Sequence, residues 1–188
     1  MQKRHRIFIA INLPADVKKR LAGYQKKWAD VPAKWTAPDN LHITLLFLGD
    51  ITDQDLAQAC QAVKEIAGRH NSFNITLNKV AYGPEDKLPP RYIWAGGEAS
   101  QEAVALKREL EDILFESIKF KLDKNVFTPH ITLARIKEWE WRAINPEERP
   151  EVGEDIDMVF TVESIEVMES ELTKQGPHYI VVESHQLQ

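Results

Sequence analysis

The tetrapeptide His-Ile-Thr-Leu occurs twice in this chain, as His42-Ile43-Thr44-Leu45 and as His130-Ile131-Thr132-Leu133. In an extended strand, residues two apart point to the same face of the sheet. Each copy therefore presents one imidazole and one hydroxyl together, while its isoleucine and leucine point into the core. We interpret each copy as a rigid strand that displays a histidine and a threonine on one side.

The segments around the two motifs alternate between strands and helices. Apolar residues recur at helical spacing over residues 17–28, after Thr52 and after Ser100, and both Thr52 and Ser100 suit a helix N-cap. Several strands follow one another through short turns, which favours an antiparallel α+β fold over a doubly wound parallel sheet. Strands are expected at residues 6–13, 73–82, 92–95, 128–135, 160–169 and 179–184. Residues 35–48 are also expected to be extended, with a turn at Pro38-Asp39-Asn40 before the first motif.

The length and composition are those of an ordinary globular chain of about one domain. The 188 residues carry a net charge of −5, which argues against a broad electrostatic grip on duplex DNA. A single cysteine, Cys60, excludes an internal disulfide framework. The apolar run at residues 7–13 is too short to span a bilayer. We therefore expect a cytoplasmic protein with no membrane association.

The negative charge is concentrated between residues 138 and 157. This segment holds eight acidic residues against two arginines, and it contains Pro146 and Pro150. Because charge runs of this kind are usually solvated, we predict a surface loop here. The rest of the chain is close to neutral, so a local cationic site stays open.

Two imidazoles and two hydroxyls suit acid–base chemistry at phosphorus. The ordinary pKa of histidine, about 6.5, allows one imidazole to take a proton from water while the other gives a proton to the leaving oxygen. Hydroxyl groups aimed at non-bridging phosphoryl oxygens would stabilise the charge that develops in the transition state. The pattern favours in-line hydrolysis without a covalent intermediate. The alternative is that both histidines only satisfy hydrogen bonds in the core.

Metal and nucleotide-triphosphate chemistry fit the sequence less well. The closely spaced His-Glu-x-x-His pattern of zinc enzymes is absent, and no carboxylate stands out as a third ligand. No phosphate-binding glycine fingerprint occurs, because Gly96-Gly97 lacks the required spacing. We expect neither a metal nor a cofactor.

The sequence resembles the 2H phosphoesterase superfamily and, within it, the RNA 2',3'-cyclic phosphodiesterases, also called 2'-5' RNA ligases. The resemblance covers nearly the whole chain and rests on the two motifs in order, with their flanks. It implies one bilobal domain over residues 1–188, in which two similar lobes of antiparallel sheet, with helices packed outside, are related by a pseudo-twofold and face a central cleft. The flanks include Arg6-Ile7-Phe8-Ile9-Ala10, Asn40-Leu41, Phe47-Leu48-Gly49, Trp94-Ala95-Gly96, Phe127-Thr128-Pro129, Ala134-Arg135 and Tyr179.

The reaction implied by this resemblance opens a terminal 2',3'-cyclic phosphate of RNA to a 2'-phosphomonoester, without metal or nucleotide cofactor. The family pattern makes His42 the proton donor to the leaving 3' oxygen and His130 the proton acceptor from water. Thr44 and Thr132 complete the catalytic set. The identical tetrapeptides do not themselves distinguish the two histidines. Ligation of RNA ends through a 2'-5' bond is expected to accompany hydrolysis by microscopic reversibility.

Three further residues are candidates for substrate binding. Arg135 could donate charge-assisted hydrogen bonds to a phosphate, Tyr179 could line the cleft, and Phe47 could stack on a base. The alternatives are a surface ion pair for the arginine and packing within the protein for the two aromatic rings. The histidines that lack a partner motif are expected at the surface, namely His5, His70 and His185.

Two other functions stay open. A related phosphodiesterase would use the same histidines on 2'-5' oligonucleotides or on a small cyclic nucleotide phosphate. A non-catalytic RNA-binding module would keep the fold and bind without turnover. The expected partner is an RNA end or a small nucleotide, and we expect a monomer.

Overall fold

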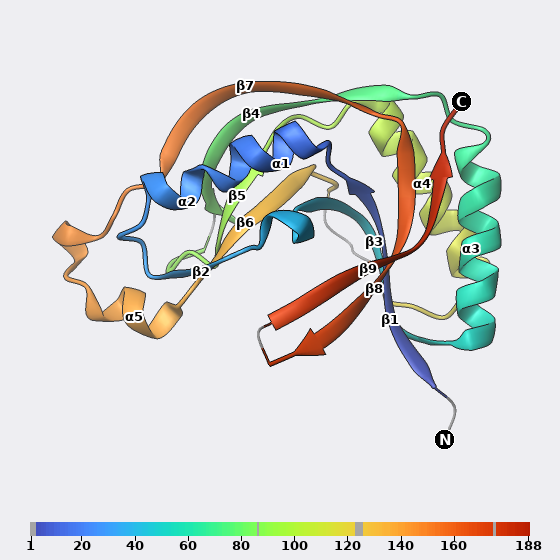
Figure 1. The fold of residues 1–188 in the computed structure, drawn as a ribbon, viewed down its shortest axis with the longest axis horizontal. Helices are drawn as coiled ribbons and strands as arrows, with labels where there is room; N and C mark the ends of the chain where they lie inside the picture. Colours follow the sequence, from blue (N-terminus) through green and yellow to red (C-terminus); the bar gives the residue numbers. More distant parts are fainter. Residues whose placement is uncertain (1–2, 86, 123–125, 175) are drawn as a thin grey trace.

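One antiparallel sheet runs through the molecule and carries both motifs (Figure 1). The computed structural model describes residues 3–85, 87–122, 126–174 and 176–188. Within these residues nine strands join in the order β7-β4-β5-β6-β3-β1-β8-β9, and β2 pairs with β6 off this path. The strands are β1 (Arg4–Asn12), β2 (Ala33–Trp35), β3 (His42–Thr52), β4 (Phe73–Gly83), β5 (Tyr92–Gly96), β6 (His130–Ile136), β7 (Gly153–Val162), β8 (Ser164–Thr173) and β9 (Gly176–Gln186).

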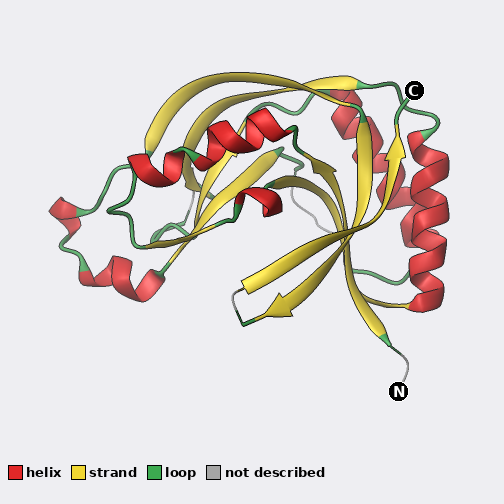
Figure 2. Ribbon diagram, viewed as in Figure 1, coloured by secondary structure: helices red, strands yellow, loops and turns green. Residues whose placement is uncertain are grey.

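Helices occupy the connections between these strands (Figure 2). The two longest, α3 and α4, lie side by side at one end of the sheet, and α1 lies toward the other end. The helices are α1 (Ala15–Ala22), α2 (Tyr24–Lys27), α3 (Asp53–Ala67), α4 (Gln101–Ser117) and α5 (Glu138–Ala143), with 3-10 turns η1 (Pro38–Asn40) and η2 (Pro146–Glu148). Among the described helices, none combines the length and apolar character needed to cross a bilayer.

The sheet has two halves that meet where β3 pairs with β6. We call β3, β1, β8 and β9 the β3 half, and β6, β5, β4 and β7 the β6 half. Each half of the sheet is covered in part by a helix that connects two strands of the other half. Leu21 of α1, which links β1 to β3, lies beside Leu133 of β6 around one small internal space. Reciprocally, α4 links β5 to β6 but contacts β3 and α3. The α+β class and the two-part antiparallel sheet are confirmed.

Two local signals start the long helices where the sequence predicts. The Thr52 hydroxyl accepts a hydrogen bond from the Asp55 backbone N–H, and the Asp55 carboxylate accepts one from the Thr52 backbone N–H. This reciprocal arrangement is a capping box, which satisfies free N–H groups at the start of α3. At α4 the Ser100 hydroxyl accepts from the Ala103 backbone N–H. Both predicted caps are confirmed.

Alternation along β1 separates the two faces of the sheet. Ile7 and Ile9 are at most 1% exposed and join the main core beneath the helices. Phe8 and Ala10 point to the opposite face and form a second, smaller apolar cluster with Met168 of β8. The face opposite the helices therefore has an apolar floor in the β3 half.

Three predicted elements are wrong in detail. The helix over 17–28 is divided at Gly23 into α1 and α2, and the strand over 160–169 is two strands, β7 and β8, divided at Glu163. The acidic segment 138–157 is not a loop, because it contains α5, η2 and the start of β7. Its helix is anchored by Trp141, which is 4% exposed and lies edge-on against Tyr82 with ring centroids 5.2 Å apart. A buried tryptophan thus fixes a segment whose charge suggested solvent.

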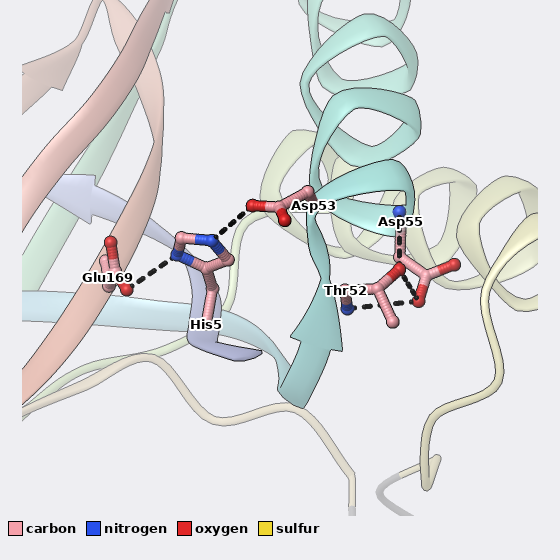
Figure 3. A network of polar contacts seen from close by, with 5 residues as sticks. All are labelled: His5, Thr52, Asp53, Asp55 and Glu169. Atoms are coloured by element: carbon pink, nitrogen blue, oxygen red, sulfur yellow. Dashed lines mark hydrogen bonds and ion pairs between the residues drawn. The ribbon is translucent and has the colours of Figure 1, made fainter. Parts of the chain in front are cut away.

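His5 is buried, which contradicts the prediction that it lies at the surface; His70 and His185 are half-buried. Nδ1 of His5 lies 2.8 Å from a carboxylate oxygen of Glu169 in β8, and Nε2 of His5 lies 2.8 Å from a carboxylate oxygen of Asp53 in α3 (Figure 3). Carboxylates only accept hydrogen bonds, so the protonated ring satisfies both contacts at once. The hydrogen bond to Asp53, followed by that to Glu169, raises the pKa of His5 above its ordinary value. The imidazolium ties β1, β8 and α3 together.

We predict that His5→Gln destabilises the fold more at about pH 6 than at about pH 9. The folded-state pKa of His5 lies above its unfolded value, so the stabilisation is fully present below the unfolded value and is lost as the pH rises through the folded one. Thermal unfolding of the variant and the parent protein at both pH values measures this. The exposed His178→Gln serves as the control. Equal destabilisation at both pH values would contradict the assignment.

Candidate active site

The pairing of β3 with β6 brings the two motifs together. Ile43 and Ile131 are direct antiparallel partners, and both are 0% exposed. Continuing this register by one residue in each direction places His42 beside Thr132 and Thr44 beside His130. These four side chains lie on the face opposite the two isoleucines, which we call the site face. The motifs thus form one two-fold arrangement in which each histidine neighbours the other copy's threonine.

A bulge follows the His-x-Thr segment in each copy at the same position. In the β1–β3 ladder the register shifts across Leu45, and in the β5–β6 ladder it shifts across Leu133. A bulge adds one residue to a strand and so reverses which later residues point to each face. Phe47 pairs with Phe8, and Arg135 pairs with Tyr92. Simple alternation would have turned both side chains away from the histidines, whereas the bulges return both to the site face.

His42 is held from both ring nitrogens. Its Nδ1 lies 2.7 Å from the Asn40 carbonyl oxygen, and its Nε2 lies 3.0 Å from the Thr44 hydroxyl. A carbonyl only accepts, so Nδ1 carries a hydrogen and Nε2 is the nitrogen that exchanges a proton. The rings of Phe8 and Tyr179 flank the imidazole at centroid distances of 5.0 and 5.1 Å.

His130 is oriented in the same way by the second copy. Its Nδ1 lies 2.8 Å from the Thr128 carbonyl oxygen, two residues earlier in the chain, as Asn40 is to His42. Its Nε2 is therefore also the nitrogen that exchanges a proton. The indole of Trp94 lies against this imidazole, with ring centroids 4.1 Å apart and planes inclined by 31°. Identical motifs thus have different aromatic neighbours.

Both histidines are biased toward the neutral form. Burial is the main cause that lowers the pKa of His42, with further lowering by the positive charge of Lys18 and by His130, while the Asn40 carbonyl opposes these effects. Burial also lowers the pKa of His130, against the opposing effect of the Thr128 carbonyl. Because the charge of protonated His130 lowers the pKa of His42, a state in which only one of the two imidazoles is protonated is favoured.

Tyr179 of β9 lies on the site face, edge-on to His42 with planes inclined by 89°. Burial raises the pKa of its hydroxyl, and the charge of Arg6 opposes this, so Tyr179 is a neutral hydrogen-bonding group. The β8–β9 hairpin that carries it is fastened to η1, where the Asn40 side-chain amide donates to the Pro177 carbonyl at 2.8 Å. One residue, Asn40, therefore supports both His42 and the hairpin that covers it.

All seven predicted site residues lie on this face. Three other residues that act on the histidines were not predicted: Trp94 and Phe8, which lie against the imidazoles, and Lys18, whose charge lowers the pKa of His42. Trp94 pairs with Thr132, and Phe8 pairs with Phe47, in strands whose neighbours the sequence does not reveal. For Trp94, one indication was present in the local sequence: Tyr92 and Trp94 are two residues apart, so their rings lie on the same face of a strand.

The available groups are imidazoles, hydroxyls and a guanidinium. Across the described part of the chain, no three His, Cys, Asp or Glu side chains gather where they could bind one metal ion. The arrangement can move two protons at opposite sides of a bound group and donate hydrogen bonds to an anion between them.

The family described as LigT like Phosphoesterase matches the chain twice, over residues 11–94 and 97–179. The RNA 2',3'-cyclic phosphodiesterase of Aquifex aeolicus (strain VF5) is 32% identical over 162 residues, covering 84% of this chain and 83% of that protein. A crystal structure from Thermus thermophilus has a TM-score of 0.84 at 29% identity, covering 97% of both chains. LigT from E. coli, solved with 3'-AMP, has a TM-score of 0.77 at 24% identity, covering 98% of this chain and 99% of that one.

The two family matches divide the chain at the end of β5, and each contains one His-x-Thr strand. They do not correspond to the two halves of the sheet. The first match contributes β3 to one half and β4 to the other, and the second contributes β6 to one half and β8 to the other. The resemblance to 2H phosphoesterases is confirmed. With both copies of the repeated unit present and interleaved in one sheet, this chain belongs to the LigT-like phosphoesterase family.

Proposed function

We propose that this protein hydrolyses the 2',3'-cyclic phosphate at an RNA end to a 2'-phosphomonoester. The observation that carries the proposal is the paired register of Ile43 and Ile131, which sets two Nε2 atoms on one face with both Nδ1 atoms fixed to carbonyls. The relative from Aquifex aeolicus, named RNA 2',3'-cyclic phosphodiesterase, supports the choice of substrate.

In the proposed reaction one histidine accepts a proton and the other histidine donates one. Nε2 of His130 accepts a proton from water as the water oxygen bonds to phosphorus. The bond from phosphorus to the 3' oxygen breaks, and Nε2 of protonated His42 donates its proton to that oxygen. The direction of transfer follows the family pattern, and exchange with solvent restores the starting protonation.

The remaining site residues would hold the substrate. Thr44 and Thr132 are proposed to donate to non-bridging oxygens, where charge builds in the transition state. Arg135 would bind the same anion with its guanidinium. Phe47, whose side chain is 66% exposed, would stack on a base, and Tyr179 would hydrogen-bond to the substrate beside His42.

The wider proposal treats residues 1–188 as one bilobal, monomeric, metal-independent unit that works in the cytoplasm on RNA ends or small nucleotides. The same two-histidine chemistry, run with a 5'-hydroxyl in place of water, would join RNA ends through a 2'-5' bond.

The first test is product identification from a short RNA that ends in a 2',3'-cyclic phosphate, incubated with the purified protein and a chelator. We expect a 2'-phosphate end and undiminished turnover, because the imidazoles supply both proton transfers. A 3'-phosphate product would reverse the proposed orientation of the substrate, and inhibition by the chelator would contradict metal independence. Cleavage of only 2'-5' oligonucleotides or small cyclic phosphates would indicate one of the related phosphodiesterases instead. Binding of RNA without turnover of any of these substrates would indicate a non-catalytic RNA-binding module.

We predict that His42→Ala and His130→Ala each lower turnover by about 10²–10⁴-fold, since each removes one proton transfer. Both side chains lie on the site face, and their strands keep the buried isoleucines, so the fold should survive; circular dichroism checks this. His178→Ala is the matched control, because His178 is an exposed histidine on the same hairpin as Tyr179. Full activity in either motif variant would refute the assignment.

We predict a bell-shaped dependence of kcat/KM on pH with its maximum below about pH 6.5. Catalysis needs one protonated and one neutral imidazole, and burial lowers the pKa of both, so this state is most populated on the acidic side of the ordinary histidine value. The cyclic phosphodiester keeps a single negative charge over this range, so ionisation of the substrate does not change the shape of the pH profile. Initial rates at low substrate concentration across the pH range give the profile, and a maximum above about pH 7 would contradict the pKa directions.

A further inference from the structure

The two catalytic imidazoles differ most in how an aromatic ring lies against them. The centroids of Trp94 and His130 are 4.1 Å apart with planes inclined by only 31°, so the imidazole lies over the indole. Around His42 the nearest rings are farther away and more steeply inclined, with Phe8 at 5.0 Å and 39° and Tyr179 at 5.1 Å and 89°. Among the described residues, only the second copy of the motif has an aromatic ring whose centroid lies this close to its imidazole.

The position of the indole is built into the sheet. A Cβ atom at Gly83 would lie 2.2 Å from a carbon of the Trp94 ring, so only glycine lets the ring lie across β4 at this point. Tyr92, two residues before Trp94, lies nearly parallel to it, with planes inclined by 10°. The buried indole N–H has no acceptor among the described residues, so packing alone sets the orientation of the ring.

Apart from Trp94, few groups around His130 could stabilise a positive charge on its ring. The Thr128 carbonyl accepts from Nδ1, and Thr132 and Arg135 share the site face on β6, while His42 and Thr44 face it from β3. Two of these groups are themselves basic. No carboxylate contacts the His130 ring in the described part of the chain. The electron-rich face of an indole attracts a cation whose centre lies within about 6 Å of the ring centroid, and tryptophan does so most strongly.

We propose that Trp94 is a positioning residue for His130, whose indole face stabilises the imidazolium formed when His130 takes a proton from the attacking water. The effect grows as the charge develops, so it acts on the transition state more than on the free enzyme. The role in turnover rests on the proposed function, whereas the stabilisation of protonated His130 is a property of the protein alone. The same indole explains how identical tetrapeptides can support different proton transfers.

The test replaces Trp94 in the full-length protein with tryptophans that carry increasing numbers of fluorine atoms. Fluorine withdraws electrons and so weakens the attraction of the ring face for a cation, with little change in the shape of the side chain. Titration of His130 is followed by nuclear magnetic resonance of its ring C–H, identified by its absence in His130→Gln. We expect the pKa of His130 to fall in step with fluorination, and the pKa of His42 to respond less. The same residues placed at Trp28, which stacks on Tyr24 away from the site, are the matched control. A His130 titration unchanged across the series would overturn the proposal.

Turnover provides the second measurement. We expect kcat to fall in the same order, by up to about 30-fold where the attraction is abolished, with Trp94→Phe retaining more activity than Trp94→Leu. A loss in kcat that tracks only the thermal stability of the variants would mean that the ring is merely structural. If the parent protein turns over no cyclic phosphate, the proposed function fails, while the titration still decides the role of the indole.

Discussion

The contact between Ile43 and Ile131 joins the two halves of the sheet, and the rest of the site depends on it. Each side chain is fully buried, which contributes about 1.5–3 kcal/mol relative to exposure. The same pairing that buries the isoleucines sets the histidines on the opposite face, because strand side chains alternate. Core packing and the placement of the two histidines therefore depend on the same strand pairing. A small shift in this register would disturb both together.

The bulges at Leu45, in the β1–β3 ladder, and at Leu133, in the β5–β6 ladder, decide which residues after each motif reach the site face. Without them the residues that follow each threonine would continue the alternation, and Phe47 and Arg135 would point into the core with the isoleucines. A bulged strand instead gives each histidine one further neighbour on the site face. Because that neighbour is apolar in one copy and cationic in the other, a two-fold scaffold presents an asymmetric surface, which suits a substrate with a base at one side and an anion at the other.

Local features were predictable from the sequence, and features that depend on pairing were not. The caps at Thr52 and Ser100 involve neighbouring residues, and the identity of the two motifs was visible at once. By contrast, the partnership of Trp94 with His130 joins residues on different strands, and no local pattern states which strands are neighbours. Helix α5 was missed because one buried side chain, Trp141, outweighs the surrounding charge. The burial of His5 likewise depends on two carboxylates far away in the chain.

The interleaving of the two family repeats has a consequence for how the chain folds. Each half of the sheet takes strands from both repeats, so neither repeat can bury its own apolar strand faces when it stands alone. The repeats must therefore fold cooperatively, with long-range pairings formed before either half is complete. Any opening between β3 and β6 would expose Ile43 and Ile131, so burial at this seam opposes separation of the two histidines. The spacing of the two histidines proposed to transfer protons is therefore maintained by the stability of the whole chain rather than by a local contact.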